Sequence, residues 1–381
     1  MVTQTKQELF SSRSTPNFGL LKTPKAIIYC EGNFAKLDGK TANGLVRQSE
    51  TYQIISVIDS NLANSDSGLI LDGTRNNVPI LRDLREAVDY QIEIPEVFIF
   101  GMAPSNGRLS TKDRKVILDA ISLGMDIVCG LHEFLSEDLE IKSAAALQRV
   151  SIRDIRKPKP TNKMRLFDGT VANVKAIRIA VLGTDCAIGK RTTATLLAKA
   201  LNAQGIKTIL IGTGQTGLMQ GARYGIAMDA LPPQFCCGEL EGAIISASNN
   251  EQPDVILIEG QGALSHPAFC TSAFILRGSQ PHAVILQHAP KRIFRCDFPQ
   301  MPMPDLSAEI SLIEAFSSAK VIGLTINHEE MTDFEIDKTI AAYSFNFSLP
   351  VSDALSRSQE QLAELVLASY PELRSLAPTI Q

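Results

Sequence analysis

The sequence lacks a strong excess of charge of either sign. Its 381 residues include 37 lysines and arginines against 41 aspartates and glutamates, a net charge of -4 at pH 7. Nucleic acids and anionic membrane surfaces are bound by clustered positive charge, so this balance favours neither partner. We therefore expect a small-molecule substrate, with no nucleic acid and no membrane.

The chain also lacks a long apolar run and a regular spacing of cysteines. No stretch approaches the ~20 apolar residues of a membrane helix, and the first residues have no apolar segment typical of signal peptides. Of seven cysteines only Cys236 and Cys237 are adjacent, so no disulfide framework is indicated. An odd, scattered set predicts reduced thiols in a cytoplasmic protein.

What is present is an ordinary globular composition. Hydrophobic residues make up 44% of the sequence and charged residues 20%. A large core can therefore be buried, which excludes a disordered chain and a small disulfide-stapled one. At roughly 100–200 residues per domain, the length predicts two domains.

The N-terminal half has the alternating pattern of an α/β domain. After a polar segment over 1–24, which we interpret as a flexible tail, short apolar runs alternate with amphipathic stretches. Such alternation predicts a parallel, doubly wound sheet, here a Rossmann-like domain over 25–153. The predicted strands are Ala26–Cys30, Ile54–Asp59, Val97–Met102 and Asp126–Leu131, and the predicted helices are Thr111–Leu123 and Glu133–Leu147.

The alternation stops over 154–174 and then resumes. This segment contains the sequence KPKP and several basic residues, including Arg156, and predicts a linker that faces solvent. The second α/β series, over 175–381, predicts a doubly wound P-loop NTPase-like domain, in which Asp305 caps a helix. Its predicted strands are Ile177–Leu182, Thr208–Ile211, Val255–Ile258, Ala283–Leu286 and Val321–Ile326, and its helices are Lys190–Ala203, Leu306–Ser318 and Gln359–Ser369.

The most informative segment is a strand, a loop and a helix over Ile179–Leu201. Loop amides, a helix N-terminus and Lys190 together attract phosphate. The strict P-loop pattern has four residues between its glycines and a Ser or Thr after the lysine, whereas here five residues intervene and Arg191 follows. The candidate phosphate ligands are Gly183, Thr184, Asp185, Cys186, Gly189, Lys190, Arg191, Thr192 and Thr193.

Two further strand ends carry candidate ligands. Glu259 ends an apolar strand, where an acid beside a phosphate loop can hold Mg²⁺ through water. Gln215 and Thr216 lie in a glycine-rich turn, where a ligand can approach the backbone closely. Asp229 follows this turn and is either a second metal ligand or a helix cap.

Arg191 bears on which ligand is bound. The residue after the P-loop lysine usually offers a hydroxyl to Mg²⁺, and Thr192 and Thr193 are rotated away from that place by ~100° per residue. A cation there can neutralise phosphate without a metal. The cofactor is therefore acetyl-CoA or, alternatively, ATP or GTP with Mg²⁺.

Three other residues are candidates for a role in catalysis or substrate binding. His266 follows the turn after Glu259 and is a possible general base for an amine. Arg108 follows a strand end and can pair with a substrate carboxylate. Cys186 either fills the phosphate loop or is a reactive thiol, because the helix dipole and Lys190 would lower its pKa.

The motifs resemble those of a known family. GTDCAIGKRTTA, TGQTG, EGQG and GSQP occur in this order in the D-glutamate N-acetyltransferase-like proteins, and GLHEFLSED and IRDIRKPKP are similar to segments of their N-terminal domain. The P-loop half is also similar to dethiobiotin synthetase. The resemblance implies a Rossmann-like and a P-loop domain and acetyl transfer to the amine of D-glutamate. Arg191 stands where members often have Met, which leaves the charge balance at the phosphate loop open. Arg277 stands where members often have His, which leaves the substrate open.

The leading hypothesis is an N-acetyltransferase that moves an acetyl group from acetyl-CoA to an amino acid. Lys190 and Arg191 would bind the phosphates, and His266 or Glu259 would take the amine proton. One alternative is an ATP-dependent kinase or carboxylate-activating ligase with Mg²⁺ on Glu259 and Asp229. Another is a nucleotide-sensing regulator. The oligomeric state stays open, a homo-oligomer included.

Overall fold

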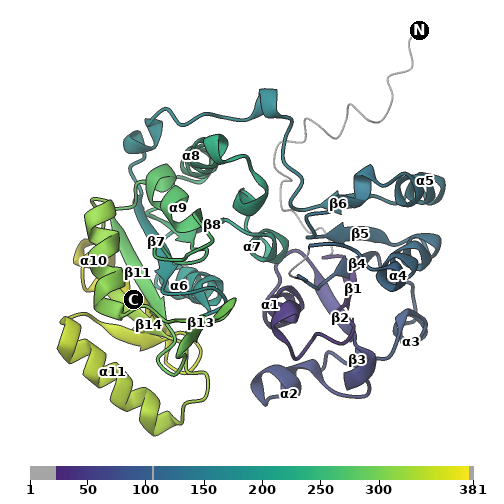
Figure 1. The fold of residues 1–381 in the computed structure, drawn as a ribbon, viewed down its shortest axis with the longest axis horizontal. Coiled ribbons are helices and arrows are strands. Elements are labelled where there is room, and N and C mark those ends of the chain that lie inside the picture. The colour runs from purple at the N-terminus through teal and green to yellow at the C-terminus, as the bar shows by residue number, and fades with distance from the viewer. Residues whose placement is uncertain (1–22, 105–106, 377–381) are drawn as a thin grey trace.

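The computed structural model describes residues 23–104 and 107–376. Most of the predicted tail therefore lies outside the described residues. Two α/β domains lie side by side, the N-terminal one in purple to blue and the C-terminal one in teal to yellow (Figure 1). Each has a sheet of parallel strands with helices packed against it, which confirms the predicted fold class.

The N-terminal sheet has six parallel strands in the order β3-β2-β1-β4-β5-β6. This is the strand order of a Rossmann fold, in which the chain moves outward from β1 in both directions. The strands are β1 (Lys25–Tyr29), β2 (Gln53–Ile58), β3 (Ile80–Leu81), β4 (Val97–Phe100), β5 (Asp126–Cys129) and β6 (Ile152–Asp154), and the helices are α1 (Lys40–Arg47), α2 (Ser67–Asp72), α3 (Leu84–Asp89), α4 (Thr111–Ser122) and α5 (Leu139–Gln148).

The helix expected over Glu133–Leu147 begins later than predicted. Leu135–Glu137 form a short 3₁₀ turn, and α5 starts only at Leu139. Asp138 caps this helix, because its Oδ1 accepts a hydrogen bond from the Ile141 amide at 3.0 Å. The same carboxylate binds Arg114 of α4, so the cap is held by a neighbouring helix.

The C-terminal sheet has seven parallel strands in the order β15-β14-β11-β7-β10-β8-β9. Asp305 caps α10 as predicted, accepting hydrogen bonds from the Ser307 and Ala308 amides at 2.9 and 3.1 Å. The strands are β7 (Ile177–Gly183), β8 (Thr208–Gly212), β9 (Tyr224–Gly225), β10 (Val255–Glu259), β11 (Ala283–His288), β14 (Lys320–Ile326) and β15 (Val351–Asp353), beside a hairpin of β12 (Phe294–Arg295) and β13 (Phe298–Pro302). The helices are α6 (Lys190–Ala203), α7 (Gln215–Gln220), α8 (Pro233–Glu251), α9 (Thr271–Ser279), α10 (Leu306–Phe316), α11 (Asp333–Phe347) and α12 (Gln359–Leu367).

Alternate residues of the central strand β7 face two separate cores. Ile179 and Val181 pack with α6 and α12 on one face of the sheet. Ala180 and Leu182 pack with α8, α9 and α10 on the other face. Because the strand is buried on both faces, nearly all of its residues are apolar. This explains why such strands appear as continuous apolar runs in the sequence.

The two domains are joined by packing between α1 and α7, which meet between the two sheets (Figure 1). Met219 of α7 is fully buried within the core of the N-terminal domain. The side-chain amide of Gln220 donates to the Gly44 carbonyl of α1 at 2.7 Å and to the carbonyl of Gln48, directly after α1, at 2.9 Å. These contacts set the position of α7, and with it the loop that precedes it.

Most residues of the segment 154–174 are exposed or half-buried, but two of them are buried against the C-terminal domain. Arg156 is only 8% exposed and pairs with Asp229 of the C-terminal domain. Further along, the Arg165 amide donates to Glu239 of α8 at 2.7 Å, and Val171 is fully buried in the C-terminal core. Part of the segment therefore packs along α8, where Lys159 and Arg165 pair with Glu239 and Glu241.

Candidate functional site

A cavity of about 1120 Å³ lies between the two domains. It opens at the carboxyl ends of β1, β7, β8 and β10, which is where open parallel sheets place their ligand sites. Its lining includes Cys186, Gly189, Lys190, Arg191, Thr192, Thr193, Gln215, Thr216, Asp229 and Glu259 from the C-terminal domain and Lys36, Lys40 and Arg47 from the N-terminal domain.

The predicted phosphate loop forms one wall of this cavity. Gly183 ends β7, and Gly189 directly precedes α6 with a φ of 100°, a left-handed conformation that favours glycine. The ammonium group of Lys190 donates to the Asp185 carbonyl and so spans the loop. Burial lowers the pKa of Lys190. The helix N-terminus and this lysine together form an anion site.

Two predicted phosphate ligands use their hydroxyls inside the protein. The Thr184 hydroxyl lies 2.9 Å from His288 Nδ1, and Thr184 is fully buried. The Thr193 hydroxyl donates to Gln287 Oε1 at 2.6 Å. Both side chains therefore hold the loop and α6 against β11, while Thr192 lines the cavity from the first turn of α6.

The back of the loop is braced by a set of residues that the sequence analysis did not find. Asp185 is fully buried, and its Oδ2 accepts hydrogen bonds from Arg292 at 3.2 Å and from the Cys296 amide at 2.9 Å. Arg292 also donates to the Cys186 carbonyl at 2.9 Å, and Arg295 to that of Thr184 at 3.2 Å. Asp185 therefore positions the loop instead of lining the cavity.

Glu259 lies at the bottom of the cavity beside the start of α7. Its Oε2 accepts a hydrogen bond from the Thr213 amide at 2.9 Å, and a Cβ at Gly217 would stand 2.5 Å from that oxygen. Burial raises the pKa of the Glu259 carboxyl, and the nearby Arg191 cation opposes the increase. A carboxyl with a raised pKa in a cleft is a candidate for proton transfer.

Arg191 reaches from the phosphate loop to the N-terminal domain. A Cβ at Gly44 of α1 would stand 2.7 Å from its Nη2, so the guanidinium packs directly on this helix. Its Nε is buried and has no hydrogen-bond partner within 23–104 and 107–376. A buried donor without a partner on the wall of a cavity is a feature that an anionic ligand would satisfy.

The glycine-rich turn provides the contact between the domains. The Thr216 hydroxyl lies 3.0 Å from that of Thr41 in α1. The Gln215 amide is 3.5 Å from the same Thr41 hydroxyl. Both predicted ligands therefore line the cavity where the two domains close on each other.

Glu259 and Asp229, the predicted metal ligands, have other partners. Asp229 Oδ2 accepts from Arg156 at 2.7 and 3.1 Å, and Glu259 has Arg191 beside it. The groups of three or more potential metal ligands among the described residues contain neither acid. Two acids that each lie beside an arginine are poorly suited to hold Mg²⁺ together.

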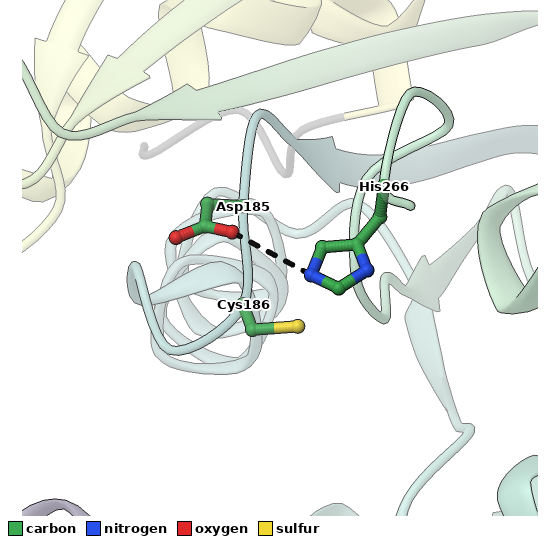
Figure 2. A group of neighbouring side chains, drawn as sticks. All are labelled: Asp185, Cys186 and His266. Atoms are coloured by element: carbon green, nitrogen blue, oxygen red, sulfur yellow. Dashed lines mark ion pairs between the residues drawn. The ribbon is translucent and has the colours of Figure 1, made fainter. Parts of the chain in front are cut away.

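His266 lies behind the phosphate loop, with its ring aimed at Asp185 (Figure 2). Its Nδ1 accepts hydrogen bonds from the Ala268 and Phe269 amides, both at 3.2 Å, and its side chain is fully buried. Burial, and then the Arg295 cation, lower its pKa. Since Nδ1 is occupied by two donors, the neutral ring carries its proton on Nε2. This geometry favours a role in positioning the loop over one as a base.

Arg108 lies apart from the residues described above. It is exposed and is not part of the cavity lining. The basic side chains that the N-terminal domain does contribute, from Lys36, Lys40 and Arg47, follow β1 instead. The run GKTANGLVR (Gly39–Arg47) carries two of these three side chains, and its Gly-Lys-Thr start, which is similar to the end of a phosphate loop, is a sequence signal that points to them.

Comparison with known proteins agrees with this architecture. Residues 165–363 match the family model described as a domain of unknown function, DUF1611_C, P-loop domain, and residues 60–158 match its N-terminal companion, described as a Rossmann-like domain. The fold and the cavity thus define a two-domain P-loop protein. The chain belongs to the DUF1611 family.

Relatives with names and a solved relative support this placement. A D-glutamate N-acetyltransferase from a Pseudoalteromonas species is 32% identical over 68% of this chain and 78% of its own length. A second protein of that name, from Tritonibacter scottomollicae, is 27% identical over 72% of this chain and 81% of its own. A crystal structure of a DUF1611 family protein from Anabaena variabilis has 29% identity and a TM-score of 0.84 over 91% of this chain and 99% of that chain. Within the part of the chain described, no helix is long and apolar enough to cross a membrane.

Proposed function

We propose that this protein is an N-acetyltransferase that moves the acetyl group of acetyl-CoA to the amine of an acidic amino acid such as D-glutamate. The observation that carries the proposal is the single cavity that joins a phosphate loop, a buried carboxyl and a basic wall from the facing domain. The names of the two curated relatives supply the reaction type and the acceptor.

The phosphate loop suits the phosphates of the carrier. Lys190 and the amides at the start of α6 supply the positive potential, and Arg191 adds a half-buried cation whose buried Nε has no partner among the described residues. Charge-assisted hydrogen bonds to phosphate are about twice as strong as neutral ones. The site thus holds phosphate with side chains and amides, with no step that needs a metal ion.

Glu259 suits the proton transfer. The amine of an amino acid is protonated at neutral pH and must lose a proton before it can attack. A buried carboxylate whose pKa is raised is a stronger base than an exposed one. Glu259 lines the same cavity as the phosphate loop, so in this proposal it lies beside the bound acetyl-CoA.

The chemistry requires no covalent intermediate on the protein. The deprotonated amine attacks the thioester carbonyl, a C–N bond forms and the C–S bond breaks. The coenzyme A thiolate leaves, and the proton released by the amine balances its charge. Holding the two reactants in one cavity supplies much of the rate enhancement. Lys36 and Lys40 offer positive charge to the carboxylates of the acceptor, whereas Arg47 is paired with Asp72 at 2.7 Å.

The direct test is an acetylation assay on the full chain. Purified protein is mixed with acetyl-CoA and D-glutamate, L-glutamate or other D-amino acids, with Mg²⁺ or with EDTA. Free coenzyme A thiol is measured, and the N-acetyl product is identified by mass spectrometry. We expect amine-dependent thiol release that EDTA leaves unchanged.

The same assay with ATP or GTP in place of acetyl-CoA separates the alternatives. Mg²⁺-dependent nucleotide cleavage with no N-acetyl product would replace this proposal with a kinase or ligase. Nucleotide binding without turnover of any substrate would instead favour a regulator.

A further inference from the structure

A pair of thiols lies where the phosphate loop meets the β12–β13 hairpin, outside the proposed catalytic chemistry. The Sγ atoms of Cys186 and Cys296 lie within 4.8 Å of each other. Cys186 belongs to the loop, and Cys296 belongs to the turn between β12 and β13. The Cys296 amide donates to Asp185 at 2.9 Å, so the backbone of the hairpin is held against the loop. Neither thiol is fully buried, and Cys186 also lines the cavity.

Two buried polar atoms beside this pair have no partners. Asp185 Oδ1 and His266 Nε2 face each other at 3.9 Å, which is beyond hydrogen-bond distance. Neither atom has a hydrogen bond to any described residue. With the Cys186 sulfur, the three atoms lie within 4.8 Å of one another (Figure 2). Buried polar atoms without partners are rare, and a redox or catalytic role is one of their recognised explanations.

A metal ion is a poor explanation for this cluster. A histidine that binds a metal through Nε2 carries its proton on Nδ1, but Nδ1 of His266 accepts two backbone hydrogen bonds. Arg292 and Arg295 lie 3.2 and 3.8 Å from the Asp185 carboxylate and already compensate its charge. The group of Asp185, Cys186 and His266 is therefore poorly suited to a metal ion. The two thiols also form a group with the exposed carboxylate of Asp297, so the test below includes an analysis for zinc.

The surroundings favour the thiolate form of one member of the pair. The hydrogen bond from Cys296, followed by the charge of Lys190, lowers the pKa of Cys186, whereas the same hydrogen bond raises that of Cys296. The start of α6 adds the positive end of a helix dipole. A thiolate that lines a cavity, with a second thiol beside it, has the features of a redox-sensitive cysteine.

We propose that Cys186 and Cys296 are a modification site, at which a peroxide converts the two thiols into a reversible disulfide that closes the phosphate loop. The Cys186 thiolate attacks one peroxide oxygen, the O–O bond breaks, and hydroxide leaves and takes up a proton as water. The resulting sulfenic acid is attacked by Cys296, an S–S bond forms, and a second water leaves. The two sulfurs lose two electrons, which reduce the peroxide.

The disulfide changes the ligand site directly. It draws Cys186 towards the hairpin and so moves the loop amides that flank Lys190 in sequence. Phosphate binding should weaken, because an anion site depends on the convergence of those amides. By reciprocity, a phosphate ligand that occupies the cavity should shift the thiol–disulfide equilibrium towards the reduced pair.

The test uses the reduced full chain and hydrogen peroxide. After oxidation, the number of titratable thiols should fall by two, and mass spectrometry should find the peptides of Cys186 and Cys296 cross-linked. Calorimetric affinity for acetyl-CoA should fall at least about tenfold, equivalent to about 1.4 kcal/mol. Dithiothreitol should restore both readouts. ADP serves as the phosphate probe if acetyl-CoA does not bind, so failure of the proposed function leaves the thiol result readable.

Two variants complete the test. Cys296→Ser should bind acetyl-CoA like the wild type before oxidation and should not form the reversible cross-link. Cys270→Ser changes an exposed cysteine and should behave as the wild type throughout. A cross-link between other cysteines, or an unaltered response of Cys296→Ser, would overturn the proposal. Stoichiometric zinc in the purified protein that protects both thiols would overturn it in favour of a metal site.

Discussion

The Arg156 guanidinium lies 2.7 Å from the Asp229 carboxylate, and this pair joins the two domains beside the cavity. The same guanidinium donates to the Gly130 carbonyl at the end of β5. A residue expected to face solvent and a residue expected to bind a metal are thus partners. Their contact helps to set the distance between the phosphate loop and the basic wall opposite.

Arg156→Ala should therefore destabilise the protein and impair ligand binding. It leaves the Asp229 carboxylate without its main partner, and the loss of charged hydrogen bonds predicts a decrease of about 1–3 kcal/mol in the free energy of unfolding. Urea denaturation measures this change. Arg85→Ala is the matched control, because its pair with Asp89 is exposed at 3.8 Å and should contribute under about 0.5 kcal/mol. Equal effects of the two substitutions would contradict a structural role for the pair.

Glu259→Gln should reduce turnover with little effect on the affinity for acetyl-CoA. Loss of a general base predicts a decrease of about 10²–10⁴-fold in kcat. Glutamine keeps an oxygen that can accept from the Thr213 amide, so the fold should persist. Steady-state kinetics of the purified variant measures both quantities. A fall in affinity with kcat unchanged would instead indicate a binding role.

The pH dependence provides a separate test of the base. The carboxylate form is active, so kcat/KM should rise with pH through the pKa of Glu259, which burial raises above its ordinary value. This rise of kcat/KM with pH, the acidic limb of the profile, should be absent in Glu259→Gln. It should persist in His266→Gln, because the Nδ1 of His266 is occupied by two backbone amides. Loss of the limb in His266→Gln alone would transfer the role to the histidine.

Lys190→Ala should remove most of the affinity for acetyl-CoA without unfolding the protein. Burial already disfavours the charge of Lys190 in the free protein, so a phosphate ligand would be its natural counter-charge. Calorimetric titration should show affinity lowered by at least about tenfold, or about 1.4 kcal/mol. Lys199→Ala, an exposed lysine on the same helix, should bind like the wild type. Wild-type affinity in Lys190→Ala would refute the phosphate loop.

The double substitution Lys36→Ala with Lys40→Ala should weaken the binding of the acceptor amino acid. Both lysines line the cavity from the N-terminal domain, opposite the phosphate loop. Loss of two positive charges near its carboxylates should raise the KM for the acidic amino acid by about tenfold and leave that for acetyl-CoA near the wild-type value. Lys142→Ala, an exposed lysine on α5, is the control. A rise in the KM for acetyl-CoA alone would place the carrier, not the acceptor, on this wall.

Sequence reasoning located the elements whose signals are local and strong. The interior strands of both sheets read as continuous apolar runs because both of their faces are buried. Short strands such as β3 and β9 contain two residues each and have no pattern of their own. The 19-residue helix α8 was missed because Gly238 and Gly242 weaken its helical pattern, and Gly238 is required where Arg165 crosses it closely.

The sequence by itself determined the phosphate loop, because a strand, a loop and a helix N-terminus that are contiguous form an anion site wherever they fold. Only the tertiary structure decided what surrounds that loop. Arg292 reaches Asp185 across 107 positions, and Arg156 reaches Asp229 across 73. No sequence pattern predicts that charged residues so far apart will pair. Their pairing depends on which strand ends the two sheets bring together at the cavity.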